Sequence, residues 1–227
     1  MTETLVLEDP AEECAGRLAA AASEGAHIAL TGGSTPKRCY ERLAEMDVDW
    51  SGATLWFGDE RCVPPDDELS NYGMAKAALL DRIGSDGPAV KRMHGEEGPS
   101  AGADDYEREL RETLGEAIPR LDMVLLGLGP DAHVASLFPG QPSLQVRDRP
   151  VVGVPEAGME PYVPRISLSL PAINAARQVV FLVTGEGKAE AVERACGGPS
   201  EDAPGSLVRP HTGELVMLLD AAAASRL

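Results

Sequence analysis

The sequence predicts an α/β protein with a mostly parallel sheet. Short apolar runs alternate with helical patterns along the chain, as in proteins whose helices cover a parallel sheet. The runs "LDMVLLGLG" and "QVVFLVTG" are apolar on both faces, which is typical of central strands. The 227 residues suffice for one sizeable core, so we expect a single domain over residues 1–227.

Eight apolar runs that are bounded by turn residues are expected to form strands. In chain order these are Leu5–Leu7, His27–Thr31, Thr54–Phe57, Leu121–Gly127, Val151–Val154, Arg165–Leu170, Val179–Thr184 and Leu215–Leu219.

Segments with a helical pattern lie between these runs. They are Pro10–Ser23, Pro36–Met46, Asn71–Ile83, Ala103–Leu114, Gly187–Ala195 and the shorter Pro204–Val208. Thr35 is expected to cap the second helix, with Pro36 as its first residue, and Ser70 is expected to cap the third. The Gly/Pro-rich stretches "GSDGP", "GEEGPSAG" and "CGGPSEDAPG" indicate surface loops.

Composition and charge restrict the partners. The chain has 20 basic and 37 acidic residues and a net charge of −17, so nucleic acid is not an expected partner. No run reaches the roughly 18 apolar residues of a membrane span, and "MTETLVLEDPAEE" lacks the regions of a signal peptide, which favours a cytoplasmic protein. An anionic ligand would need a local cluster of Arg, Lys and backbone N–H groups to offset this charge.

The cysteines give no sign of a metal or disulfide framework. Cys14, Cys39, Cys62 and Cys196 are scattered, with no CxxC pair and no Cys/His spacing typical of zinc. We therefore expect free thiols that mostly serve as packing residues.

Four loops are expected to meet at one rim, because parallel sheets bind ligands at the carboxyl ends of their strands. The first is "LTGGSTP", in which Gly32 and Gly33 allow a sharp turn and Ser34 and Thr35 add hydroxyl donors. A helix N-terminus after such a turn suits phosphate. A plain strand-to-helix turn explains the same residues equally well.

The second loop follows "TLWF" and carries Asp59, Glu60 and Arg61. Taken alone, this group favours a solvated turn with an internal ion pair over a functional site.

The third loop, "LGLGPDAHVASLFPG", is the most unusual stretch. His133 follows a central strand and has Asp131 two residues before it, and an imidazole beside a carboxylate is suited to general-base chemistry. The alternative is a histidine that merely caps "VASLF". The other histidines, His27, His94 and His211, lack comparable surroundings and are interpreted as structural.

The fourth loop, "FLVTGEGK", carries the cation of Lys188, and a further cation, Arg165, adjoins the predicted rim. Lys188 lies in the first turn of a helix after "VVFLV", where a cation is mildly unfavourable unless an anion is bound. Arg165 opens the strand in "PRISLSLPAIN". The alternatives are a solvated lysine and a surface salt bridge.

Taken together, these blocks resemble the 6-phosphogluconolactonase family, which shares a superfamily with the glucosamine-6-phosphate deaminases. The resemblance includes "WFGDERCVPPDDELSNYGMAKAALL" and "DMVLLGLGPDAHVASLFPG" and reaches nearly the length of the chain. It implies a Rossmann-like αβα sandwich, no metal and no cofactor. It also implies hydrolysis of 6-phospho-D-glucono-1,5-lactone to 6-phospho-D-gluconate in the pentose phosphate pathway. The sequence does not give the oligomeric state, and we expect a monomer or small homo-oligomer.

The resemblance also implies roles for individual residues. His133 matches the family's proposed general base, and Arg61 matches its active-site arginine. Gly32, Gly33, Ser34 and Thr35 match the ligand-side loop, while Arg165 and Lys188 match basic residues associated with phosphate. Asp131, if it reaches the imidazole ring, would hold the tautomer of His133. The family usually has glycine before this histidine, so Ala132 would be strained if its φ is positive.

Two other functions fit parts of the pattern. The first is an amino-sugar phosphate isomerase/deaminase. The relatives with that activity resemble Asp-Glu-Tyr at the second loop and carry Asn-Glu-Pro after the histidine. This chain instead has Asp59-Glu60-Arg61 and Ser136-Leu137-Phe138-Pro139. A non-catalytic sugar-phosphate sensor could dispense with the base, which this chain retains.

Overall fold

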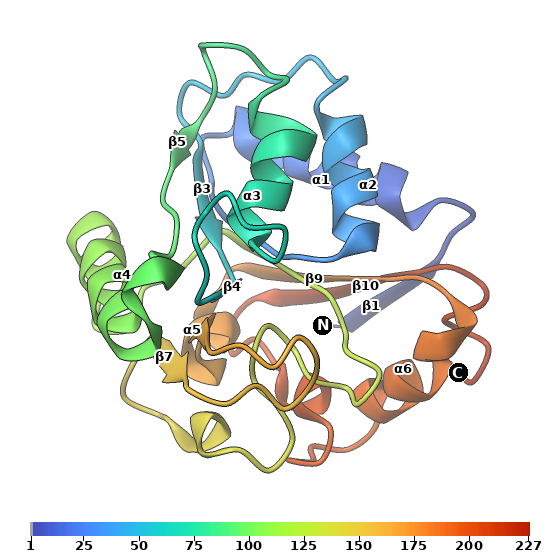
Figure 1. Ribbon diagram of the computed structural model, residues 1–227. Helices are drawn as coiled ribbons and strands as arrows, with labels where there is room; N and C mark the ends of the chain where they lie inside the picture. Colours follow the sequence, from blue (N-terminus) through green and yellow to red (C-terminus); the bar gives the residue numbers. More distant parts are fainter. Residues whose placement is uncertain (1) are drawn as a thin grey trace.

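A seven-stranded parallel sheet between two layers of helices forms the centre of the protein (Figure 1). The computed structural model describes residues 2–227. In spatial order the strands are β1 (Thr2–Val6), β10 (Glu214–Leu219), β9 (Gln178–Val183), β6 (Met123–Leu126), β2 (His27–Leu30), β3 (Thr54–Phe57) and β5 (Ala89–Val90). Every neighbouring pair runs parallel, which confirms the predicted αβα class.

The helices cover both faces of this sheet (Figure 1). On one side lie α1 (Pro10–Ser23), α2 (Ser34–Leu43) and α3 (Asn71–Ala75), which continues as a π-helical turn at Lys76–Leu80; on the other lie α5 (Leu170–Ala175) and α6 (Ala189–Cys196). Short 3₁₀ turns occupy Gly95–Glu97, Pro142–Gln145, Glu186–Lys188 and Pro204–Leu207.

A second, antiparallel sheet lies beside the first. Its order is β4 (Asp59–Arg61), β8 (Arg165–Leu168) and β7 (Val151–Val154), and α4 (Pro99–Leu114) packs on β7 and β8. The alternation of strand and helix patterns did not predict this sheet, because its short strands give no sign of their partners.

The order of the parallel strands reverses between β2 and β6. From β2 the chain proceeds outward to β3 and β5, and from β6 it proceeds the other way to β9 and β10. The neighbours β2 and β6 pair directly, through Ile28 with Met123 and Ala29 with Val124. Because the connections leave such a point in opposite directions, a crevice opens beyond the carboxyl ends of the two strands.

The core confirms the interpretation of the central strands. All four residues of β6 are buried, as are the last five of β9, so these strands are covered on both faces. All four cysteines are free thiols, as expected, and Cys14 and Cys39 are buried packing residues. Among residues 2–227, no helix combines the length and apolar character that a membrane crossing needs.

Several predicted boundaries were wrong. Asp59–Arg61 is a strand rather than a turn, and β5 and α5 were not predicted. The helix expected from Ala103 begins at Pro99, and the segment expected at Pro204–Val208 is a 3₁₀ turn.

The start of α2 also differs from the prediction. Gly33 precedes the helix with φ 110°, and Ser34 is its first residue, so Thr35 is not the cap. Glycine tolerates this dihedral angle where a hydroxyl residue would be strained. Pro36 fits at the third position because the first-turn N–H groups have no intrahelical partner. The predicted Ser70 cap is confirmed, since its hydroxyl accepts a hydrogen bond from Gly73 N at 3.0 Å.

Candidate active site

A cavity of about 280 Å³ opens at the crevice between β2 and β6. All four predicted loops contribute to it. Of the nine predicted site residues, eight line the cavity: Gly32, Gly33, Ser34, Thr35, Arg61, His133, Arg165 and Lys188. The ninth, Asp131, contacts His133.

The glycine-rich turn after β2 forms one wall of the cavity. Gly32 has no room for a side chain, because an added Cβ would lie 1.9 Å from Oδ1 of Asn71. Gly33 then directs the chain into α2, whose first-turn N–H groups and positive dipole end lie at this wall. Thr35 Oγ1 lies 2.9 Å from Thr184 Oγ1, which joins the turn to the end of β9.

His133, in the cavity wall, forms a close pair with Asp131. Nδ1 of the histidine lies 2.6 Å from Oδ1 of the aspartate, which also accepts a hydrogen bond from the His133 backbone N–H at 3.1 Å. With the Nδ1 proton directed to the carboxylate, Nε2 is the basic nitrogen of the ring. Burial would raise the pKa of Asp131, but the hydrogen bonds and charge of His133 outweigh it and hold that pKa below its ordinary value.

The turn that carries this pair is under strain. Ala132 has φ 67° and Ala135 has φ 47°, so both alanines adopt a left-handed conformation that glycine tolerates better. Gly129 is the close neighbour of the pair, because a Cβ there would lie 2.0 Å from Nδ1 of His133. The suspected positive φ at Ala132 is therefore present, and the turn still places His133 in the cavity wall.

Three cations line the cavity without an acidic partner. Among the described residues, Arg61, Arg165 and Lys188 have no carboxylate within 4.0 Å and bond instead to backbone carbonyls. Arg61 donates to Leu69 at 2.6 Å, and Lys188 donates to Leu128 at 2.7 Å. The alternative interpretations, a surface salt bridge for Arg165 and a solvated Lys188, are therefore both wrong.

The electrostatics of these cations favour an anion. Arg61 and Arg165 are paired residues of the β4–β8 ladder. Burial, and then the charge of Arg61, lower the pKa of Arg165, although the charges of Asp59 and Glu60 oppose the shift. Burial lowers the pKa of Lys188, and the charge of Asp131 opposes that shift. The buried Nε of Arg61 has no hydrogen-bond partner in the part of the chain that the structure describes. An anion in the cavity would relieve the cost of keeping these groups charged.

The predicted solvated turn at Asp59-Glu60-Arg61 is wrong as well. Glu60 is buried and accepts hydrogen bonds from the N–H groups of Arg61, Asn71 and Tyr72 and from the Ser70 hydroxyl, at 2.7 to 3.0 Å. It therefore anchors the start of α3. Burial raises the pKa of Glu60, although these bonds oppose the rise.

Sequence reasoning missed part of the cavity wall. The sequence pattern marks Asn71 only as the start of a helix, and it predicts no role for Ala135, Phe138, Met159 or Glu160, which also line the cavity. The signal for Asn71 was its place after the charged loop. The segment with Met159 and Glu160 offers no comparable motif, because its contribution depends on the path of a long loop.

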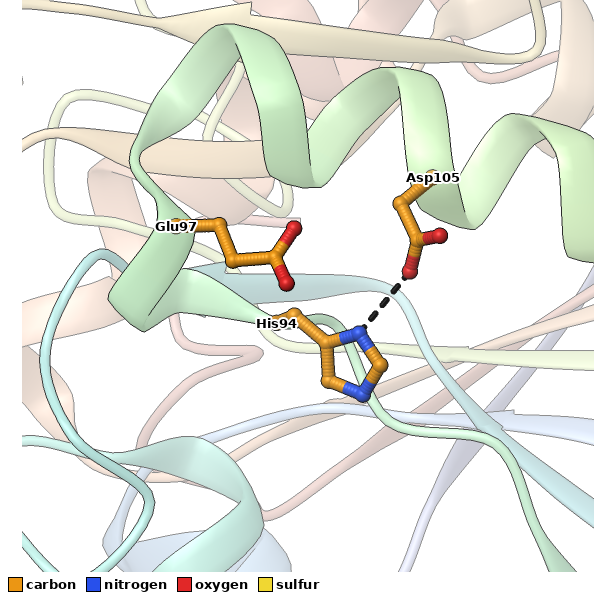
Figure 2. A group of neighbouring side chains, drawn as sticks. All are labelled: His94, Glu97 and Asp105. Atoms are coloured by element: carbon orange, nitrogen blue, oxygen red, sulfur yellow. Dashed lines mark hydrogen bonds and ion pairs between the residues drawn. The ribbon is translucent and has the colours of Figure 1, made fainter.

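One group of described residues could hold a metal ion, and it lies outside this cavity wall. The ligand atoms of His94, Glu97 and Asp105 lie within 4.8 Å of one another (Figure 2). Asp105 already bonds to Nδ1 of His94 at 2.8 Å and pairs with Arg108. A cation would have to displace these contacts, so we assign none to the group, and a reaction without metal stays a prediction.

Comparisons with known proteins agree on one family. Residues 2–217 match the model of the glucosamine-6-phosphate isomerases/6-phosphogluconolactonase family. A 6-phosphogluconolactonase of Nostoc sp. is 42% identical over 209 residues, covering 88% of this chain and 84% of the relative. A 6-phosphogluconolactonase of Homo sapiens is 42% identical over 173 residues, covering 75% of this chain and 67% of the relative.

Solved structures give the same result for the fold. A 6-phosphogluconolactonase from Trypanosoma cruzi is 32% identical and superimposes with a TM-score of 0.86, covering 100% of this chain and 97% of the other. A monomeric glucosamine-6-phosphate deaminase reaches a TM-score of 0.83 over 100% of this chain and 99% of its own at 22% identity, which shows a shared fold alone.

Proposed function

Because the chain belongs to the glucosamine-6-phosphate isomerase/6-phosphogluconolactonase family, we propose that it is a lactonase. Its substrate in this proposal is 6-phospho-D-glucono-1,5-lactone, which it hydrolyses to 6-phospho-D-gluconate in the pentose phosphate pathway. The observation that carries the proposal is the cavity itself. His133, held by Asp131, lines one small space together with three cations that have no acidic partner among the described residues.

The reaction begins with water. A lactone is an ester, so water must attack C1 and the ring oxygen must leave. His133 takes a proton from the attacking water through Nε2 and returns a proton to the departing alkoxide. Asp131, at 2.6 Å from Nδ1, holds the tautomer and stabilises the imidazolium that forms.

Negative charge develops on the carbonyl oxygen as water adds. Backbone N–H groups of the glycine-rich turns are donors of the kind that stabilise such an oxyanion. Arg61, which lines the cavity, adds a guanidinium charge that would stabilise the same oxygen.

The phosphate needs a site of its own within the net charge of −17. We assign it to the N-terminus of α2, the hydroxyl groups of Ser34 and Thr35, and the cations of Arg165 and Lys188. These groups enter the cavity from β2, β8 and the turn after β9, so the phosphate would fix the sugar ring relative to His133.

The test is hydrolysis of freshly made lactone, corrected for the spontaneous reaction, with glucosamine 6-phosphate as a second substrate. The proposal expects acid release from the lactone and no ammonia from the amino sugar. Ammonia release would indicate the isomerase/deaminase instead. Tight binding of 6-phosphogluconate with no hydrolysis above background would indicate a sugar-phosphate sensor.

A further inference from the structure

Three buried side chains, Ser136, Asp59 and Asn71, lie between the turn that carries His133 and the glycine-rich turn after β2; we call them the bridge. The Ser136 hydroxyl donates to Oδ2 of Asp59 at 2.7 Å. Nδ2 of Asn71 donates to Oδ1 of the same aspartate at 3.1 Å and to its backbone carbonyl at 2.9 Å. The exposed fractions are 5% for Asp59, 2% for Asn71 and 0% for Ser136.

The Ser136 end of the bridge controls the turn of His133. Ser136 lies three residues after the histidine, in a turn closed by a bond from Leu137 N to Val134 O at 2.9 Å. Its own N–H donates to the Ser167 hydroxyl of β8 at 3.2 Å. Two bonds thus fix this turn against the small antiparallel sheet.

The Asn71 end controls the glycine-rich turn. Oδ1 of Asn71 is buried, has no hydrogen-bond partner among the described residues, and lies where a Cβ on Gly32 would be only 1.9 Å away. The two bonds from Nδ2 to Asp59 determine which way the amide faces. They therefore place its oxygen beside Gly32.

We propose that Asp59 is a positioning residue that sets the separation between the catalytic histidine and the phosphate-binding turn. Asp59 lines the cavity, yet both of its carboxylate oxygens already accept hydrogen bonds from neighbouring side chains. It acts on the substrate through Ser136 and Asn71 rather than by taking a proton. This inference rests on the proposed lactonase function.

The two ends of the bridge should affect different kinetic constants. Ser136→Ala should lower kcat about tenfold with KM within about twofold, because a displaced imidazole slows the reaction. Asn71→Ala should raise KM about tenfold, because the phosphate turn is loosened. In a double-mutant cycle, Asp59→Ala combined with Ser136→Ala should cost no more in kcat than Asp59→Ala alone.

The conservative variant Asp59→Asn separates positioning from proton transfer. Asparagine can accept from Asn71 and donate to the Ser136 hydroxyl, so the bridge persists, and at least about a tenth of the wild-type kcat should remain with an unchanged pH profile. A loss beyond about a hundredfold would identify Asp59 as a proton-transferring base and overturn the inference.

Glu107→Gln provides the matched control. Glu107 is a similarly buried acid on α4, bonded to Arg149 and Arg111 at 2.7 Å and absent from the cavity wall. Its kcat and KM should stay within about twofold of wild type. Thermal melts establish that each variant folds. If Asp59→Ala does not fold, Ser136→Ala, which removes a single hydroxyl, tests the bridge in its place.

The outcomes separate this inference from the proposed function. Hydrolysis by wild type with unchanged kcat in Ser136→Ala and unchanged KM in Asn71→Ala would overturn the bridge alone. If wild type does not hydrolyse the lactone, the proposed function fails. The affinities of wild type and Asn71→Ala for 6-phosphogluconate, measured by calorimetry, then test the bridge. The bridge expects about tenfold weaker binding in Asn71→Ala, and equal affinities would overturn it.

Discussion

Two histidine–aspartate pairs among the described residues have nearly the same geometry. Nδ1 of His133 lies 2.6 Å from Asp131, and Nδ1 of His94 lies 2.8 Å from Asp105. Both imidazoles are partly buried, with 19% and 35% of the side chain exposed. The hydrogen bond alone therefore does not distinguish a catalytic pair from a structural one.

The surroundings make the difference. His133 lines a cavity together with Arg61, Arg165 and Lys188, none of which has an acidic partner in the described chain. His94 has Glu97 nearby (Figure 2), and its partner Asp105 also pairs with Arg108. The first pair therefore adjoins a space that can hold a substrate and cations that can bind an anion, and we identify it as part of the candidate active site. The second links a 3₁₀ turn to α4.

Replacing each histidine should give the largest difference in kcat between the two pairs. His133→Ala should lower kcat at least about a hundredfold, because general-base catalysis contributes roughly 10²- to 10⁴-fold. His94→Ala should leave kcat within about twofold. Initial rates of lactone hydrolysis, corrected for the spontaneous reaction, measure both. Equal losses in the two variants would show that the cavity does not distinguish the pairs.

Replacing each aspartate should give a smaller contrast. Asp131→Asn should lower kcat at least about tenfold, because the amide favours the wrong tautomer of His133 and leaves the imidazolium unstabilised. Asp105→Asn should change kcat less than about twofold. The same assay applies, with KM as the check that substrate binding is retained. Wild-type kcat in Asp131→Asn would leave the orientation of the imidazole unexplained.

The pair in the cavity should also affect stability at acid pH. Since the pKa of Asp131 is lower in the folded chain than its unfolded value near 3.9, the pair stabilises the fold above that value. The contribution is lost as pH falls through the lowered pKa. The unfolding free energies of wild type and Asp131→Asn should therefore converge below about pH 4. A gap that stays constant from pH 6 to pH 3 would contradict this.

The smallest effect should come from the strained alanine beside His133. Ala132→Gly removes the strain of a left-handed alanine, which costs about 1–2 kcal/mol. The same substitution loses the burial of a methyl group and increases the entropy of the unfolded chain, and each of these destabilises the fold by about 1 kcal/mol. The net change should stay within about 1 kcal/mol. Ala15→Gly, in the buried middle of α1, has no strain to relieve and should cost about 2 kcal/mol. Urea unfolding of both variants compares them, and similar losses would argue against the strain.

Most of the parallel sheet could be predicted from sequence because its signals are local. The apolar run at Thr54–Phe57 and the Pro-initiated pattern at Pro10–Ser23 have the predicted bounds. Their periodicity and turn residues reflect burial that any partner strand or helix would impose.

The predicted site residues come together for a related reason. In a parallel sheet, turns that follow neighbouring strands lie at one edge, so "LTGGSTP" and "LGLGPDAH" meet wherever β2 pairs with β6. The cation at Lys188 joins them through the end of β9.

The rest depends on pairings that no local pattern specifies. Asp59-Glu60-Arg61 has the composition of a solvated turn, yet its residues pair with Ser167, Ile166 and Arg165, more than a hundred positions away. The role of Glu60 depends on four donors brought together by that pairing and by α3. Likewise, Gly33 is the N-cap of α2, although the preference of caps for hydroxyl residues predicts Thr35.

The central claim is that one cavity holds the phosphate at the α2 N-terminus and presents C1 of the same sugar to His133. A crystal structure with bound 6-phosphogluconate tests it most directly. The account predicts the phosphate within hydrogen-bond reach of Arg165 or Lys188, and the C1 carboxylate within about 3.2 Å of Nε2 of His133, directly or through one water. A ligand bound with C1 turned away from this imidazole, or with its phosphate outside the glycine-rich turn, would contradict it.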